Sequence, residues 1–203
     1  MAVRTVIFDW GGTLTPWHGV DHQALWHGVC VQHYAQAEAA EVARAIYQAE
    51  RAVWQDIERS QESATLTHVF ERARVSVPDA LLASYFAAWE PHTLTDPDAL
   101  PLFRELRRRD IRIGVLSNTL WPRAVHDRCF ARDQVLDLLD GTVYSSELPW
   151  MSTARIPMPW APCTSSKGRS PTKTHLAGSS SPTAVMAARN ASGCGLVQGS
   201  SLE

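Results

Sequence analysis

Short apolar runs alternate along the chain with segments of helical spacing. Residues 3–8 are rich in β-branched and aromatic side chains and end at Asp9, as a buried strand does before a functional loop. Two more apolar runs, 111–116 and 141–144, read as strands, and Ser117–Asn118 follow the first of them. Strands that alternate with helices predict an α/β fold with a parallel sheet.

The long segment between the first two strands has helical spacing. Apolar side chains recur every three or four residues over residues 22–90, where few residues favour strands. Pro78 precedes a new apolar stripe that Pro91 closes. We expect two further helices, one between Asp98 and the turn at Arg109–Asp110, and one from about Pro122 to Asp140.

Composition narrows the class of protein. The 203 residues suffice for one core domain and a small insertion, and the formal net charge of −2 comes from acids and bases that are mixed along the chain. We therefore expect neither a nucleic-acid nor a membrane partner. No apolar run reaches membrane-spanning length, and the first residues lack a basic region followed by an apolar signal core, so we expect a cytoplasmic location. The cysteines are widely scattered, which argues against a zinc site, a redox motif or a disulfide framework. They are Cys30, Cys129, Cys163 and Cys194.

Polar groups suited to phosphoryl chemistry follow two of the predicted strands. Ligands of parallel sheets bind at the carboxyl ends of the strands, where Asp9 and Ser117–Asn118 lie. A carboxylate can attack a phosphoryl or carbon electrophile if N–H groups and cations hold the substrate against it. Gly11–Gly12 would let the backbone approach an anion closely, and Thr13 adds a hydroxyl donor.

Two segments carry a resemblance to a known family. "VIFDWGGTLT" resembles the first motif of the haloacid dehalogenase-like (HAD) hydrolases, and "IGVLSNT" resembles their second motif. The resemblance covers about residues 3–150 and implies a Rossmann-like core with a parallel sheet. The family inserts a mainly helical cap between these motifs. The expected division is therefore a core of residues 1–19 and 91–150 with a cap of residues 20–90.

The resemblance also implies roles for the residues at the strand ends. Asp9 corresponds to the nucleophile that forms an aspartyl-phosphate when the substrate is a small phosphorylated metabolite. The family uses Mg²⁺, for which the corresponding positions are Asp9 and Gly11. The positions that would hold the phosphate oxygens are Gly12, Thr13, Ser117 and Asn118.

The chain departs from the family in ways that predict impaired catalysis. Gly11 stands where most phosphatases of the family have the aspartate that acts as general acid and base. The family's third-motif lysine and its magnesium-binding acids have no recognisable counterpart, because no acid occurs from Ser152 until Glu203. The sequence thus leaves two alternatives: an impaired phosphatase-type hydrolase, or an inactive HAD-like protein that serves as a binding or interaction module.

The composition changes abruptly near residue 151. Residues 151–203 are rich in Ser, Thr, Gly and Pro, which predicts a disordered or irregular low-complexity tail rather than a domain. The hypothesis that explains this change is an out-of-frame translation of an ordinary HAD C-terminus, and the alternative is a genuine disordered tail. In the shifted frame, the codons of Ile156–Pro159 can encode His-Pro-Asp-Ala, and those of Pro182–Ala184 can encode Ala-Asp-Arg. His-Pro-Asp-Ala resembles the segment that follows the family's third-motif lysine, and Ala-Asp-Arg resembles the family's fourth motif.

Overall fold

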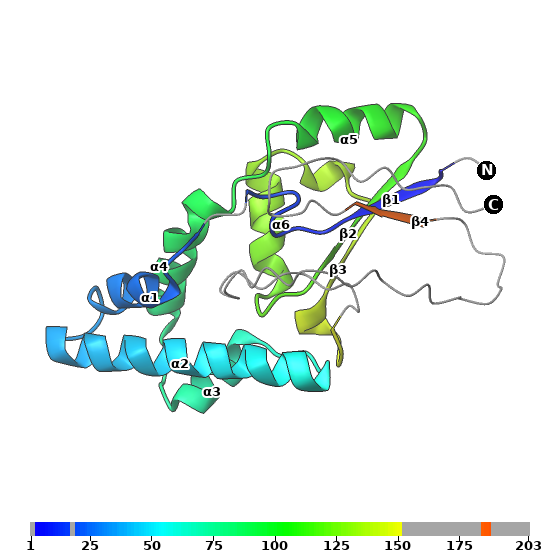
Figure 1. The fold of residues 1–203 in the computed structure, drawn as a ribbon. Coiled ribbons are helices and arrows are strands. Elements are labelled where there is room, and N and C mark those ends of the chain that lie inside the picture. Colours follow the sequence, from blue (N-terminus) through cyan, green and yellow to red (C-terminus); the bar gives the residue numbers. More distant parts are fainter. Residues whose placement is uncertain (1–2, 17–18, 152–183, 188–203) are drawn as a thin grey trace, which may run out of the picture.

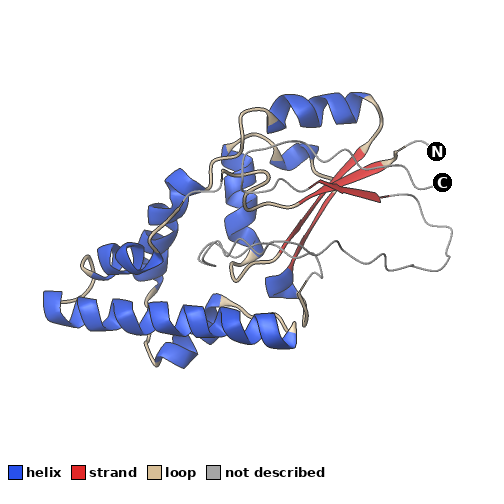
Figure 2. Ribbon diagram, viewed as in Figure 1, coloured by secondary structure: helices blue, strands red, loops and turns tan. Residues whose placement is uncertain are grey.

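The computed structural model describes residues 3–16, 19–151 and 184–187, the last of these as backbone (Figure 1). Helices and strands alternate in the order expected from the sequence, with five α-helices described between the first two strands (Figure 2). The elements, with η marking a 3₁₀ helix, are β1 (Thr5–Phe8), α1 (His22–Cys30), α2 (Gln36–Ser60), α3 (Leu66–Ala73), α4 (Asp79–Trp89), η1 (Glu90–His92), α5 (Ala99–Arg108), β2 (Arg112–Ser117), α6 (Arg123–Arg132), η2 (Leu136–Leu138), β3 (Gly141–Tyr144), η3 (Ser145–Glu147) and β4 (Ala184–Ala187).

All pairings in the sheet are parallel, and the strand order is β3-β2-β1-β4. Phe8 of β1 pairs with Val115 of β2, and Ser117 pairs with Tyr144 of β3. The carboxyl ends of these three strands therefore meet at one edge of the sheet. The predicted α/β fold with a parallel sheet is confirmed.

One face of the sheet carries the first of two hydrophobic cores. In β2 the side chains of Ile113, Val115 and Ser117 are buried while those between them are more exposed, as a period of two requires. Helices α5 and α6 supply Phe103 and Phe130 to this core, both fully buried. Burial of side chains of this size stabilises the fold by about 1.5–3 kcal/mol each.

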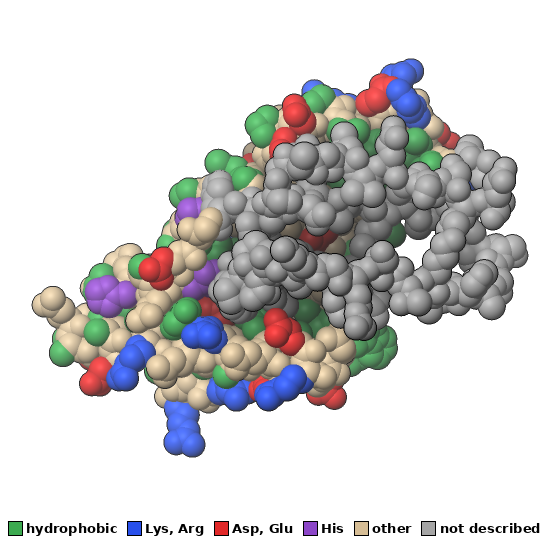
Figure 3. Space-filling view, viewed as in Figure 1, with side chains coloured by type: hydrophobic (Ala, Val, Ile, Leu, Met, Phe, Trp, Pro, Cys, Tyr) green, Lys and Arg blue, Asp and Glu red, His purple; other side chains and the backbone are tan. Residues whose placement is uncertain are grey.

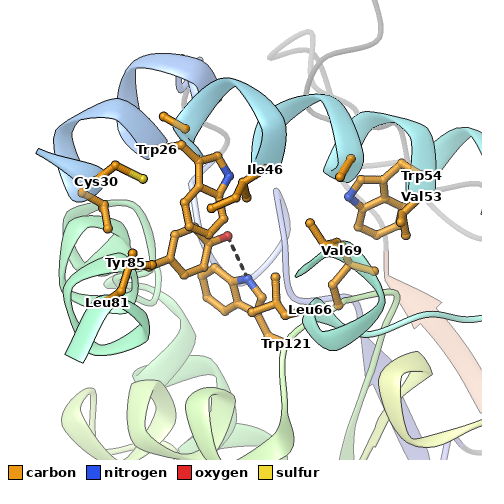
Figure 4. Close-up of a cluster of buried hydrophobic side chains, with 14 of the residues drawn as sticks. Trp26, Cys30, Ile46, Val53, Trp54, Leu66, Val69, Leu81, Tyr85 and Trp121 are labelled. Atoms are coloured by element: carbon orange, nitrogen blue, oxygen red, sulfur yellow. Dashed lines mark hydrogen bonds between the residues drawn. The ribbon is translucent and has the colours of Figure 1, made fainter. Parts of the chain in front are cut away.

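A second core lies among α1–α4 (Figure 4). The apolar stripe of α2 predicted from the sequence is buried there, apart from the half-buried Val42. Trp26 of α1 stacks on Tyr85 of α4, with ring centroids 4.2 Å apart and planes within 9°. The Trp26 indole N–H donates to the buried carboxylate of Glu50 at 2.9 Å. Packing of these side chains holds the four helices together as one unit. Caps such as Asp21, which accepts from the Ala24 amide, stabilise the individual helices.

The four helices contact the loops at the carboxyl edge of the sheet. The Leu66 amide at the start of α3 donates to the Leu120 carbonyl at 3.0 Å. The Trp121 indole N–H donates to the Tyr85 hydroxyl at 3.3 Å, a bond drawn in Figure 4. Trp10 packs against both cores, so the residue after Asp9 lies where they meet.

Acids and bases are mixed on the face seen in Figure 3, in agreement with the mixed charge pattern of the sequence. Asp56 on α2, for example, pairs with Arg59 and with Arg72 of α3. In the part of the chain that the structure describes, no helix has the length and apolarity needed to cross a membrane.

The structure differs from the sequence-based expectation at two places. The helix expected over residues 122–140 ends at Arg132. The Asp133 carboxylate there accepts hydrogen bonds from Thr95 and Arg132, and Gln134 has a left-handed φ of 60°, which a helix does not continue through. Within the tail expected to be disordered or irregular, the described residues Ala184–Ala187 form strand β4 beside β1. Their apolar sequence lacks Gly and Pro and therefore suits a strand. The other tail predictions, including the frameshift, lie outside the described residues.

Candidate active site

Asp9 and Ser117 lie together at the ends of adjacent parallel strands. Asp9 follows β1, and Ser117 ends β2, with a side chain that is only 3% exposed. The Asp9 carboxylate accepts a hydrogen bond of 2.7 Å from the Trp10 amide and another from the Ser117 hydroxyl. The two side chains thus face one site, as the sequence motifs predict.

Burial dominates the electrostatics of Asp9. Desolvation raises the pKa of the Asp9 carboxyl from 3.8 to about 6, although the hydrogen bonds from Trp10 and Ser117 lower it. The charged carboxylate is therefore held at a cost in free energy. A cation or a polarised substrate beside Asp9 would relieve that cost, which is a property expected of a reactive site.

A glycine turn follows Asp9 and folds the chain back on itself. Gly12 has a φ of 73°, a left-handed conformation that a residue with a Cβ adopts only with strain. The Trp10 carbonyl accepts from the amides of Thr13, Leu14 and Thr15 at 3.3, 2.9 and 3.0 Å. The Thr13 amide is thus used inside the turn. Its hydroxyl remains a predicted phosphate ligand.

The loop after β2 is tied to the end of β3. Asn118 is half-buried, and its predicted role toward phosphate stays a prediction. The Thr119 amide donates to the Ser145 hydroxyl oxygen at 2.8 Å, and that hydroxyl donates back to the Thr119 carbonyl at 3.1 Å. Ser146 donates to the Trp121 carbonyl at 2.7 Å. These bonds fix the backbone that carries Ser117 and Asn118.

Aromatic side chains pack against one another beneath the loops at the strand ends. The central one, His126, was not predicted from the sequence. Its ring stacks on Tyr144 and meets Trp10 edge-on, and Trp121 packs against Trp10 with centroids 5.6 Å apart. The signal that was present is the spacing in α6, which puts His126 on the same buried face as Phe130.

The described residues do not form a magnesium site by themselves. Nowhere in the described ranges do three His, Cys, Asp or Glu side chains come together so as to hold a metal ion. Of the two positions that the resemblance assigns to the metal, Asp9 offers a carboxylate and Gly11 only backbone oxygen. Mg²⁺ demands near-octahedral oxygen coordination, so substrate and water would have to supply most of it.

Two solved structures to which this chain is similar are a dehalogenase and a predicted phosphatase. The L-2-haloacid dehalogenase of Xanthobacter autotrophicus shares 16% identity with a TM-score of 0.45, over 74% of this chain and 60% of that one. A predicted phosphoglycolate phosphatase from Haemophilus somnus shares 14% identity with a TM-score of 0.45, over 74% of this chain and 66% of that one. The chain thus spans 60–66% of the length of these proteins.

A search of curated proteins gives no significant match. The family model for haloacid dehalogenase-like hydrolases matches residues 3–149, which include the elements from β1 to β3 with α1–α6 between them, and the positions of Asp9 and Ser117. The match takes in most of the chain, and this protein belongs to the haloacid dehalogenase-like hydrolase family.

Proposed function

We propose that this protein is a cytoplasmic hydrolase of small phosphorylated metabolites, with Asp9 as the nucleophile. The observation that carries the proposal is the Asp9 carboxylate hydrogen-bonded to Ser117 where two adjacent parallel strands end. A carboxylate at this edge can reach a ligand bound in the crevice outside the strand ends. Its raised pKa is consistent with a group kept out of bulk water for reaction.

The proposed reaction has two steps. An oxygen of the Asp9 carboxylate attacks phosphorus, the bond to the ester oxygen breaks, and the leaving group departs with the bonding electrons. Water then attacks phosphorus in the aspartyl-phosphate, the bond between phosphorus and the carboxylate oxygen breaks, and the water gives up a proton to solvent. This step returns free Asp9 and inorganic phosphate. We propose that Ser117, Asn118, Thr13 and the Gly12 amide hold the phosphoryl oxygens during both steps.

Turnover should be slow because Gly11 has no proton to give or take. A missing general acid–base group costs roughly 10²- to 10⁴-fold in rate. The first step is less affected when the leaving group is a good one, such as p-nitrophenolate. The second step still lacks a base for its water, so we expect the aspartyl-phosphate to persist. Mg²⁺ is part of the proposal through the family resemblance alone, with Asp9 and Gly11 as its positions.

We further propose that residues 20–90 act as a cap over the site, on a core of residues 1–19 and 91–150. In support, α3 and α4 contact the loop after β2 through Leu120 and Trp121. Trp10 packs against the core of the four helices as well as that of the sheet. A cover at this position would exclude water and help to select the substrate.

The test is a rapid-mixing assay with p-nitrophenyl phosphate, with and without Mg²⁺, on the full chain. The proposal expects a burst of p-nitrophenolate no larger than the enzyme concentration, followed by slow turnover. Asp9→Asn should abolish the burst, whereas Asp137→Asn, which changes an exposed aspartate, should leave it intact. A parallel assay with a 2-haloacid and chloride detection tests attack on carbon. Asp9-dependent chloride release without a phosphate burst would overturn the choice of phosphate esters.

A second candidate is a binding module without turnover, and the absence of a side chain at Gly11 favours it. Such a protein would bind inorganic phosphate or a phosphate ester reversibly through the same strand-end groups. Calorimetry with inorganic phosphate distinguishes the two. Saturable binding without any burst indicates a binding module, and a burst indicates a hydrolase.

A further inference from the structure

One buried imidazole contacts residues at the carboxyl ends of all three strands of the site. His126 on α6 is 0% exposed, and its Nε2 lies 3.2 Å from the Thr119 hydroxyl oxygen in the loop after β2. Its ring stacks on Tyr144, the last residue of β3, with centroids 4.3 Å apart and planes within 11°. Trp10, the residue after Asp9, meets the same ring edge-on at 4.4 Å and 87°.

The imidazole is neutral, and this fixes the kind of contact it makes. Burial, aided by the Arg123 cation, lowers the pKa of His126 to about 3. A neutral imidazole offers one donor and one acceptor nitrogen. The Thr119 hydroxyl oxygen already accepts from the Trp121 amide at 3.0 Å, so its bond with His126 completes a short network in that loop.

Space-filling alone is a poor explanation for this residue. His126 Nδ1 is buried and has no hydrogen-bond partner among the described residues. An unpaired buried nitrogen lowers stability, whereas phenylalanine would fill similar space without that penalty. The feature that phenylalanine would lack is the bond to Thr119, in the loop that carries Asn118. The ring contact with Trp10 adds a link to the loop that carries Asp9.

We propose that His126 is a positioning residue, which holds the Asp9 loop and the Ser117–Asn118 loop in register through Trp10 and Thr119. It touches neither substrate nor the reacting atoms, and it acts by limiting the relative motion of the two loops. An effect of His126 on catalysis depends on the proposed function. The contacts of His126 with Trp10 and Thr119 do not depend on it.

The experiment compares four variants of the full chain. His126→Phe keeps a stacking ring and removes the bond to Thr119. Thr119→Val removes the same bond from the other side, together with the acceptor of the Trp121 amide. The third variant combines both changes. Phe130→Leu is the control, because Phe130 is equally buried on α6 and packs in the sheet core. Amide hydrogen exchange over residues 9–13 and 117–121, and affinity for inorganic phosphate, are measured with global stability.

We expect His126→Phe and Thr119→Val each to speed exchange in both loops and to weaken phosphate binding by about 2- to 10-fold, the equivalent of one hydrogen bond. The double variant should lose no more phosphate affinity than Thr119→Val alone, since His126→Phe removes a bond that Thr119→Val has already removed. Phe130→Leu should lower the global stability without a faster amide exchange that is confined to the two loops. Unchanged loop exchange in His126→Phe, or fully additive losses in the double variant, would overturn the proposal.

The two proposals fail in different ways. If the unmodified chain binds no phosphate and gives no burst, the proposed function fails, and loop exchange still tests the role of His126. If phosphate binds but the loops exchange alike in all variants, the positioning role fails alone. Should His126→Phe not fold, Thr119→Val tests the same bond with a smaller change.

Discussion

Replacing Asp9 by asparagine should stabilise the protein at alkaline pH. The folded pKa of about 6 lies above the ordinary value of 3.8, so the native state binds a proton more tightly than the unfolded chain. Stability from this group is present in acid and is lost as pH rises through about 6. A shift of roughly two units corresponds to about 3 kcal/mol, and the partial exposure of Asp9 reduces the expected effect to about 1–2 kcal/mol.

The assay is urea denaturation of the unmodified chain and Asp9→Asn at about pH 8 and about pH 4.5, where the native carboxyl is mostly ionised and mostly protonated, respectively. The variant should gain free energy of unfolding at the higher pH and little at the lower one. Asp137→Asn, an exposed change of the same kind, should alter it little at either pH. An equal offset for Asp9→Asn at both pH values, or a loss at the higher one, would refute a desolvated carboxylate.

Three further substitutions test the packing and hydrogen bonds that hold the two cores. Glu50→Ala should cost about 1–3 kcal/mol of unfolding free energy, since it leaves the buried indole N–H of Trp26 without its acceptor, whereas the exposed Glu58→Ala should cost little. Phe103→Ala should cost about 3–5 kcal/mol by opening a cavity in the sheet core, measured by urea denaturation. Arg132 donates to the Thr93 carbonyl at 2.7 Å and so holds the linker before α5. Arg132→Ala should free this linker, and a protease should then cut it faster.

The sequence predicts the sheet and the pairing of its two motifs well. The apolar runs before Asp9 and Ser117 are short and end in polar residues, a pattern that local sequence alone reveals. Parallel strands with crossover helices then bring their carboxyl ends to one edge, as observed. The end of α6 was not predictable in this way, because Asp133 stops the helix through a bond to Thr95, a residue far away in the sequence.

Contacts between segments distant in sequence explain what else sequence reasoning missed. Trp121 was unremarkable in the sequence, yet it joins the two cores by bonding Tyr85 and packing on Trp10. His126 lies among apolar neighbours of α6, and only the fold reveals that Thr119 and Trp10 meet its ring. The raised pKa of Asp9 likewise depends on burial, which motif spacing does not give.

The central claim is that Asp9 attacks phosphorus, and the most direct measurement is a search for the covalent intermediate. The full chain is mixed with p-nitrophenyl phosphate, quenched in acid within the burst, and analysed by intact-protein and peptide mass spectrometry. The account predicts added mass equal to one phosphoryl group, located on the peptide that contains Asp9 and absent from Asp9→Asn. A p-nitrophenolate burst without this mass, or with the phosphoryl group on another residue, would contradict it.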